Sequence, residues 1–179
     1  DWSSDVCSSD LSSLARLHRA ITPEMAAAVA KLMANKELVY VAAKIRVVSR
    51  CRNTLGGQNV FGVRIQPNHP TDDLGGILLS AVDGLLFGCG DAVIGVNPAA
   101  DSVETVMTIL HSLDRLIEAT GAPTQHCCLA HVTTQLAALD RGAPIDLLFQ
   151  SVAGTQAANS SFGVTLATLA EARSRVLES

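Results

Sequence analysis

Four polar side chains in this sequence stand within or directly after short apolar segments. Arg64, Gln66, Asn97 and Gln150 each follow Val, Ile or Phe residues. A guanidinium only donates hydrogen bonds, whereas a carboxamide both donates and accepts. Left unpaired in an apolar interior, each group would cost about 1–3 kcal/mol. These side chains therefore either bind a polar ligand or bond to one another as an internal polar layer, and the residue types alone leave both interpretations open.

The segments that carry these residues are predicted to be parallel strands. Apolar runs of strand length occupy Phe61–Pro67, Asp91–Pro98, His126–Val132 and Asp146–Val152, and helical stretches separate them. Alternation of strand and helix favours right-handed crossovers and a parallel sheet, in which ligand-contacting groups gather at the carboxyl ends of the strands. Two α/β architectures fit this pattern: an open doubly wound sheet, or part of a (β/α)8 barrel.

Apolar spacing and capping residues predict the helices between the strands. Leu74–Leu86 carries apolar side chains at i, i+3 and i+4, which defines one buried stripe. Asp101 and Glu104 form a D-x-x-E pattern that predicts a capping box at the start of the next helix, and Gly121 closes that helix. A last helix is expected from about Ser161 to Leu177.

Cysteine and histidine spacing indicates neither a disulfide framework nor a metal centre. The 5 cysteines form an odd set without C-x-x-C spacing. His126, Cys127, Cys128 and His131 come nearest to a ligand cluster, but on a strand Cys127 faces away from its two neighbours. We therefore expect buried thiols and no metal, with His131 a hydrogen-bonded core residue and His126 a surface or loop residue.

Composition argues against several classes of function. The net charge is −4 and no stripe of Lys and Arg is present, which argues against nucleic-acid binding. The sequence has no uncharged apolar run of about 18 residues, so no membrane span is expected and the default is a soluble protein of the cytoplasm. Gly88-Cys89-Gly90 precedes a strand, whereas a dinucleotide-binding glycine motif follows one.

The chain is expected to have three parts. Residues 1–11 (DWSSDVCSSDL) repeat Ser-Ser-Asp and are predicted to be non-native sequence, so they are excluded from the fold. Residues 12–60 are predicted to be a helical lead-in, in which Thr22 caps a helix and Leu38–Val48 shows β character with mixed periodicity. Strand–helix repeats occupy residues 61–179.

Five motifs resemble a known enzyme family. They are FGVRIQPN at residues 61–68, GDAVIGVNP at 90–98, LAHVTTQ at 129–135, RGAP at 141–144 and FQSVAG at 149–154. In this order they resemble the large subunit of ethanolamine ammonia-lyase, from about Leu17 through Glu178. The resemblance implies a (β/α)8 barrel that holds adenosylcobalamin and converts ethanolamine to acetaldehyde and ammonia by radical rearrangement.

The resemblance also implies roles for the matching residues. Arg64 and Gln66 of R-x-Q and Asn97 of V-N-P would bind the substrate, while Pro98 and Gln150 of F-Q-S would contact the corrin side of the cofactor. Ethanolamine suits this set, because Arg64 can donate to the hydroxyl oxygen and the amide oxygens can accept from the ammonium. No metal ligand is transferred. The family's acidic substrate partners would lie beyond these residues, so the catalytic groups stay unknown.

The implied partners are ethanolamine, the small subunit of the enzyme and further copies of the large subunit. Neither nucleic acid nor a membrane is expected. The implied location is the cytoplasm, with a bacterial microcompartment as the narrower alternative.

Length separates this chain from a closed barrel. Only four predicted strand–helix units follow Phe61, whereas a closed barrel has eight, in about 250 residues. Residues 61–179 are therefore predicted to be the first half of a barrel, a fragment that is inactive alone. Two other classes stay open: another barrel enzyme, such as a non-radical lyase or an aldolase, and a non-catalytic interaction module. No lysine stands at a strand end to form a Schiff base, as an aldolase would need.

Overall fold

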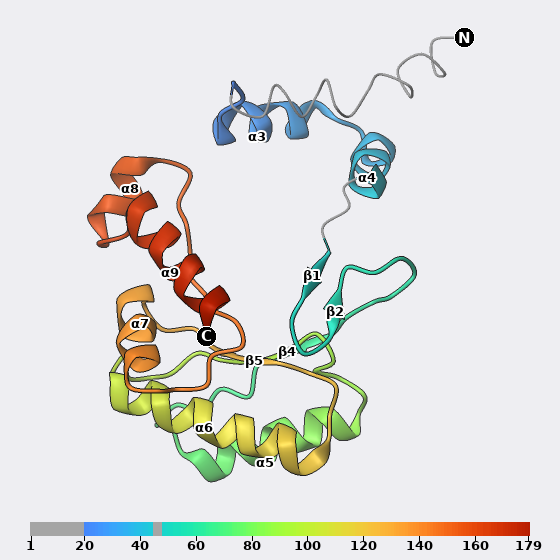
Figure 1. Ribbon diagram of the computed structural model, residues 1–179. Helices are drawn as coiled ribbons and strands as arrows, with labels where there is room; N and C mark the ends of the chain where they lie inside the picture. The colour runs from blue at the N-terminus through green and yellow to red at the C-terminus, as the bar shows by residue number, and fades with distance from the viewer. Residues whose placement is uncertain (1–19, 45–47) are drawn as a thin grey trace. The chain divides into compact units, whose positions relative to one another are not determined.

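The computed structural model describes residues 20–44 and 48–179 and divides the chain into two compact units (Figure 1). The first unit is Asp1–Arg46 and the second is Val47–Ser179. The segment 1–11, which the sequence predicts to be non-native, lies outside the described residues. Every residue of the predicted ligand site belongs to the second unit.

The described part of the first unit contains the helices α3 (Pro23–Leu32) and α4 (Asn35–Lys44). Thr22 caps α3, because its hydroxyl oxygen accepts a hydrogen bond from the Met25 N–H at 3.2 Å. This confirms the predicted helix start. The β character expected for Leu38–Val48 is wrong over residues 38–44, which belong to α4, and residues 45–47 lie outside the described residues. The carboxylate of Glu37 stabilises the start of α4 by accepting from the Ala34 N–H at 2.7 Å.

The second unit begins with a short antiparallel pair, β1 (Ser49–Arg50) and β2 (Thr54–Leu55). A three-stranded parallel sheet follows, built from β3 (Arg64–Ile65), β4 (Val93–Val96) and β5 (His126–Cys128), in that spatial order. The prediction of an α/β fold with a parallel sheet is therefore confirmed.

The core lies between this sheet and the helices α5 (Leu74–Leu86) and α6 (Val103–Thr120), which lie on the same side of β4 and β5 (Figure 1). Alternate residues of the strands enter it, so Ile94 and Val96 are fully buried. The helices contribute the apolar stripes that their spacing predicts, including Ile77, Ala81, Val106, Leu110 and Leu113. One face of the sheet is therefore buried against the helices, and only the other face and the strand ends are available to bind a ligand.

The start of α6 differs from the predicted capping box. Ser102, not Asp101, is the N-cap, and its hydroxyl accepts from the Thr105 N–H at 3.1 Å. Glu104 instead pairs with Arg141 at 2.8 Å. The end of the helix is as predicted, because Gly121 adopts a left-handed conformation with φ +63°.

The predicted fourth strand, Asp146–Val152, is not a strand in the structure. The side chain of Gln135 takes the place of a neighbouring strand: its amide donates to the Phe149 carbonyl at 2.5 Å, and its oxygen accepts from the Phe149 N–H at 3.1 Å. Gln135 belongs to α7 (Val132–Asp140), which follows β5. The predicted strand segment has no ladder partner among the described residues.

The last helix, predicted from about Ser161 to Leu177, is α9 (Leu166–Glu178), and a further short helix, α8 (Gln156–Ser161), precedes it. The turn between them contains Gly163, at φ +77°, and Thr165, which caps α9. Within residues 20–44 and 48–179, we find no helix that is both long and apolar enough to span a membrane.

Candidate functional site

The side chain of Arg64 extends over β4 on the face of the sheet that is turned away from α5 and α6. Ile94 and Val96 point into the core, so strand alternation places Gly95 on the other face. A Cβ built on Gly95 would lie 2.8 Å from Nη2 of Arg64 and 3.0 Å from its Nε. The guanidinium therefore rests directly on the backbone of Gly95, and any side chain at that position would displace it.

Gln66 and Asn97 are the first residues after β3 and β4, and both are exposed. Asn68 connects them. Its N–H donates to the Gln66 carbonyl at 2.8 Å, and its Oδ1 accepts from the Asn97 N–H at 2.8 Å. β3 and β4 are paired and parallel, with Arg64 opposite Val93 and Ile65 opposite Ile94. Gln66 and Asn97 therefore follow their strands at the same carboxyl rim of the sheet, whereas Arg64 is the first residue of β3 and its side chain reaches toward that rim as far as Gly95.

The two residues expected on the cofactor side belong to the same rim. Pro98 directly follows Asn97 and is half-buried. Gln150 reaches the rim without a strand, because its Oε1 accepts from the N–H of Val132, the first residue of α7, at 2.8 Å. Its Nε2 donates to the Ser151 carbonyl at 2.9 Å.

The loop after β3 holds the loop after β4 by main-chain hydrogen bonds. The carboxylate of Asp72 accepts from the Ala99 N–H at 2.7 Å and from the Ala100 N–H at 2.9 Å. Asp72 itself has φ 54°, a left-handed conformation that is uncommon for a non-glycine residue. These two carboxylate bonds, together with the bond from Asn68, fix the path of the chain past Asn97.

His131 is hydrogen-bonded as expected, but it is an N-cap at the rim and only half-buried. Its Nδ1 accepts from the Thr133 N–H at 3.3 Å, which leaves a proton on Nε2 to donate to the Phe162 carbonyl at 3.0 Å. Its own N–H donates to Asp101 at 3.1 Å. Both ring nitrogens are thus used by the protein.

The adjacent thiols are buried, as predicted. Burial raises the pKa of Cys127 to about 11, which the charge of Arg64 opposes, and burial raises the pKa of Cys128 to about 12. Both are protonated thiols at neutral pH and therefore poor nucleophiles and metal ligands. Across the part of the chain that the structure describes, no group of three or more His, Cys, Asp or Glu side chains is arranged to hold a metal ion.

His126 is not the surface or loop residue that the sequence suggested. Its side chain is 0% exposed, and its Nε2 lies 3.4 Å from Asp146 and 3.7 Å from Asp114. Arg52 bonds both carboxylates, at 2.8 Å and 2.5 Å respectively. Burial lowers the pKa of His126, and the charge of Arg52 lowers it further, whereas the two carboxylates act in the opposite direction.

The expectation for His126 failed because its partners are distant in sequence. They come from the β1–β2 turn, α6 and the segment after α7, and no local spacing connects them. The run of small apolar residues after His126 was the available signal of burial. Because His126 pairs with Ile94, whose side chain enters the core, and contacts Asp114 of α6, this cluster lies on the helix side of the sheet, on the face opposite Arg64.

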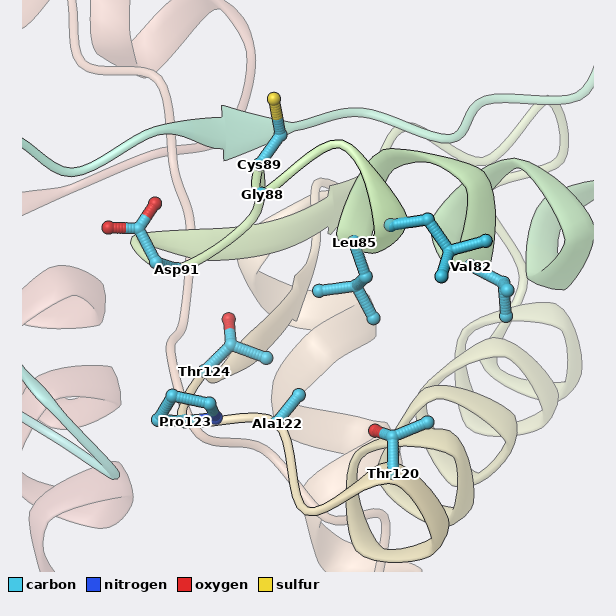
Figure 2. Close-up of a pocket in the computed structure, with 10 residues that line it drawn as sticks. Val82, Leu85, Gly88, Cys89, Asp91, Thr120, Ala122, Pro123 and Thr124 are labelled. Atoms are coloured by element: carbon cyan, nitrogen blue, oxygen red, sulfur yellow. The ribbon is translucent and has the colours of Figure 1, made fainter.

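A pocket of about 360 Å³ lies toward the amino ends of the strands. Figure 2 shows Leu85 and Thr120 on two sides of it, with Asp91 at its edge. The Asp91 carboxylate is already bonded to the Val63 N–H at 2.8 Å, and the Thr124 hydroxyl to the Gly90 carbonyl. The predicted ligand residues do not line this pocket, and its polar groups serve the main chain, so it is not the candidate site.

The candidate site is therefore the carboxyl rim around Arg64, Gln66 and Asn97. One exposed guanidinium supplies donors, and two exposed carboxamides supply both donors and acceptors. Such a set can hold a small ligand that carries an oxygen at one end and an ammonium at the other. The nucleophilic and metal-binding alternatives receive no support from the cysteines beside it.

Comparison with known proteins gives a consistent picture. The family model of the ethanolamine ammonia lyase large subunit (EutB) matches residues 6–179. Over 160 residues the chain is 45% identical to the ethanolamine ammonia-lyase large subunit of Escherichia coli (strain K12), and 44% identical to that of Salmonella typhimurium (strain LT2). Both alignments cover 89% of this chain but 35% of the relative. The chain thus spans about a third of the length of these relatives.

Proposed function

The chain belongs to the ethanolamine ammonia-lyase large-subunit family, and from this premise we propose that its carboxyl rim binds ethanolamine in such an enzyme. In the intact subunit, residues 61–179 form the first half of a (β/α)8 barrel, and the remaining strands come from chain outside these residues. The reaction is the conversion of ethanolamine to acetaldehyde and ammonia. The 179-residue chain is inactive by itself.

Arg64 holds the hydroxyl oxygen of the substrate. Its guanidinium can only donate, and the missing side chain of Gly95 leaves room for it to lie against β4. Gln66 and Asn97 turn their amide oxygens toward the ammonium group. These contacts set the orientation of the two carbon atoms between the oxygen and the nitrogen, which a rearrangement of the amine requires.

The rim also suits a cofactor rich in amide groups. Gln150 keeps a second amide hydrogen beyond its bond to Ser151, and Pro98 offers a half-buried apolar surface beside Asn97. These two residues would hold adenosylcobalamin, which supplies the radical chemistry when bound. The protein's own residues bind and orient the substrate and exclude water from it.

The proposal extends to the assembly. The small subunit and further large subunits complete the enzyme in the cytoplasm, within a microcompartment where the host cell forms one. The partner surfaces lie outside the candidate site, since the rim itself is taken up by substrate and cofactor.

The observation that carries this proposal is the position of the Arg64 guanidinium over Gly95, two residues before Asn97 on β4. The test is ammonia release by an intact large subunit that carries this sequence, assembled with its small subunit and adenosylcobalamin. We expect Arg64→Ala and Asn97→Ala each to raise KM for ethanolamine at least about tenfold and to lower kcat, because each removes at least one hydrogen bond to a charged or reacting group.

Arg115→Ala is the matched control, because Arg115 is an exposed arginine of α6 whose guanidinium bonds Ser112 one turn away, at 3.4 Å. Its kinetics should equal those of the wild type. Unchanged steady-state constants for Arg64→Ala and Asn97→Ala would remove both residues from the site.

A further inference from the structure

Side chains of the loop between β3 and α5 accept hydrogen bonds from the main-chain N–H groups that follow β4. Pro98 has no N–H, so the segment 97–100 offers the N–H groups of Asn97, Ala99 and Ala100. All three donate to side chains of the preceding loop, the first to Asn68 and the other two to Asp72. The end of β4 is therefore held by its neighbour in the sheet and not by its own strand or helix.

We propose that Asn68 and Asp72 are positioning residues, which hold Asn97 where its side chain meets the ammonium group of the substrate. This inference rests on the proposed function of the rim. It adds two residues that do not contact substrate but act through the main chain on either side of Pro98.

Asn68 couples two of the substrate residues. Its N–H is bonded to the Gln66 carbonyl and its Oδ1 to the Asn97 N–H, both at 2.8 Å. A shift of the β3 loop therefore moves Gln66 and Asn97 together. The main-chain N–H of Asn68 thus bonds the chain at Gln66, and its side chain bonds the chain at Asn97.

Asp72 supplies the stronger part of the restraint. Its two oxygens accept one N–H each, at 2.7 Å and 2.9 Å, and bonds to an ionised acceptor are stronger than neutral ones. The left-handed conformation of Asp72, at φ 54°, points to a loop held in a specific shape. The next residue, Asp73, differs: it caps α5 through the Gly76 N–H at 2.8 Å and bonds within its own helix.

The test is a double-mutant cycle in the intact enzyme with ethanolamine and adenosylcobalamin. We expect Asn68→Ala and Asp72→Ala each to raise KM for ethanolamine about three- to tenfold, the range of one or two lost hydrogen bonds. In the Asn97→Ala background the same substitutions should change KM less than twofold, because the side chain that they position is gone. A purely structural role would give the same factor in both backgrounds.

Conservative variants separate positioning from folding. Asn68→Asp keeps an oxygen acceptor for the Asn97 N–H and should restore KM to within about threefold of the wild type. Asp72→Asn keeps one acceptor but turns an NH2 group toward the second amide, so it should behave more like Asp72→Ala. Asp73→Asn removes the same charge one residue away while keeping a good helix cap, and it should leave KM unchanged.

The outcomes distinguish this inference from the proposed function. If Asn97→Ala leaves KM unchanged, the proposed substrate contact fails and the positioning role falls with it. If Asn97→Ala raises KM but Asn68→Ala does not, the positioning role alone is wrong. Equal effects of Asn68→Ala in the presence and absence of Asn97 would also overturn it, and this pair decides the matter even if Asp72→Ala does not fold.

Discussion

Arg64 depends on the absence of a side chain beneath it. Gly95 lies between two buried core residues of β4, and the guanidinium of Arg64 lies directly over its α-carbon. No other residue would allow the guanidinium to lie this close to the strand. At the scale of single residues, the candidate site therefore depends on a glycine as much as on an arginine.

Gly95→Ala should weaken substrate binding without unfolding the protein. The added Cβ would lie 2.8 Å from Nη2 of Arg64, so the guanidinium must move, but it is the far end of a flexible side chain and can do so. In the intact enzyme we expect KM for ethanolamine to rise about tenfold, and the double variant with Arg64→Ala to be no worse than Arg64→Ala alone.

Gly57→Ala is the control for this prediction. Its Cβ would make an ordinary contact with Val60 at 3.5 Å. Wild-type kinetics for Gly95→Ala would show that the guanidinium does not act from its position over β4.

His126 gives the protein a pH-dependent contribution to stability. Burial lowers the pKa of its imidazole, Arg52 lowers it further, and Asp146 and Asp114 oppose this shift. The unfolded state therefore binds the proton more readily than the folded state. The stabilisation is complete above about pH 6.5, the usual pKa, and is lost as the pH falls below that value.

The measurement is the melting midpoint of the wild type and of His126→Asn, which keeps a donor and an acceptor but does not titrate. When the pH is lowered from about 7.5 to about 5.5, the melting midpoint of the wild type should fall by more than that of the variant. Equal losses in the two proteins would contradict this account of the cluster.

At the scale of elements, prediction succeeded where the signal is local. Both the strand at Val93–Val96 and the helix at Leu74–Leu86 formed as predicted. Each could be predicted from the apolar pattern of its own residues. The segment after Asp146 has the same apolar character, but it can become a strand only if a neighbouring strand pairs with it. In the structure the side chain of Gln135, distant in sequence, takes up its main-chain groups.

The same limit applies to the site. Gln66 and Asn97 could be named as candidates because each directly follows an apolar strand segment, and Arg64 because alternation places it on the same strand face as Gln66. Gly95, Asn68 and Asp72 could not, since their roles arise from contacts between neighbouring strands and loops. Side-chain bonds to another loop's main chain leave no periodic pattern in the sequence.

Ser102→Ala should destabilise α6 by about 1 kcal/mol, because Ser102 and not the predicted Asp101 is its N-cap. Ser102→Thr should keep most of the stability, since threonine is also a good cap. The measurement is the free energy of unfolding in denaturant. Glu104→Gln should lower the free energy of unfolding by less than Ser102→Ala does. An equal loss from Glu104→Gln would show that Glu104 takes part in capping.

At the scale of the whole molecule, the sheet presents unpaired edges. Among the described residues, β3 and β5 of the parallel sheet each bond a single neighbouring strand, β4. Open edges favour pairing with other chains. The proposed barrel would satisfy them with strands from the remainder of an intact subunit.

The isolated 179-residue chain should therefore release no ammonia from ethanolamine in the presence of adenosylcobalamin, and it should self-associate. Ammonia assay and sedimentation velocity measure the two properties, with the intact, assembled enzyme as the positive control. Robust turnover by the isolated chain would refute the proposal that the rim needs the remaining strands.

The most direct measurement is a structure of the intact large subunit with ethanolamine bound. The predicted result places the substrate oxygen about 3 Å from the guanidinium of Arg64, and its nitrogen at a similar distance from the amide oxygens of Gln66 and Asn97. Ethanolamine bound elsewhere in the subunit, or an Arg64 side chain turned toward α5 and α6, would contradict the assignment of this rim as the substrate site.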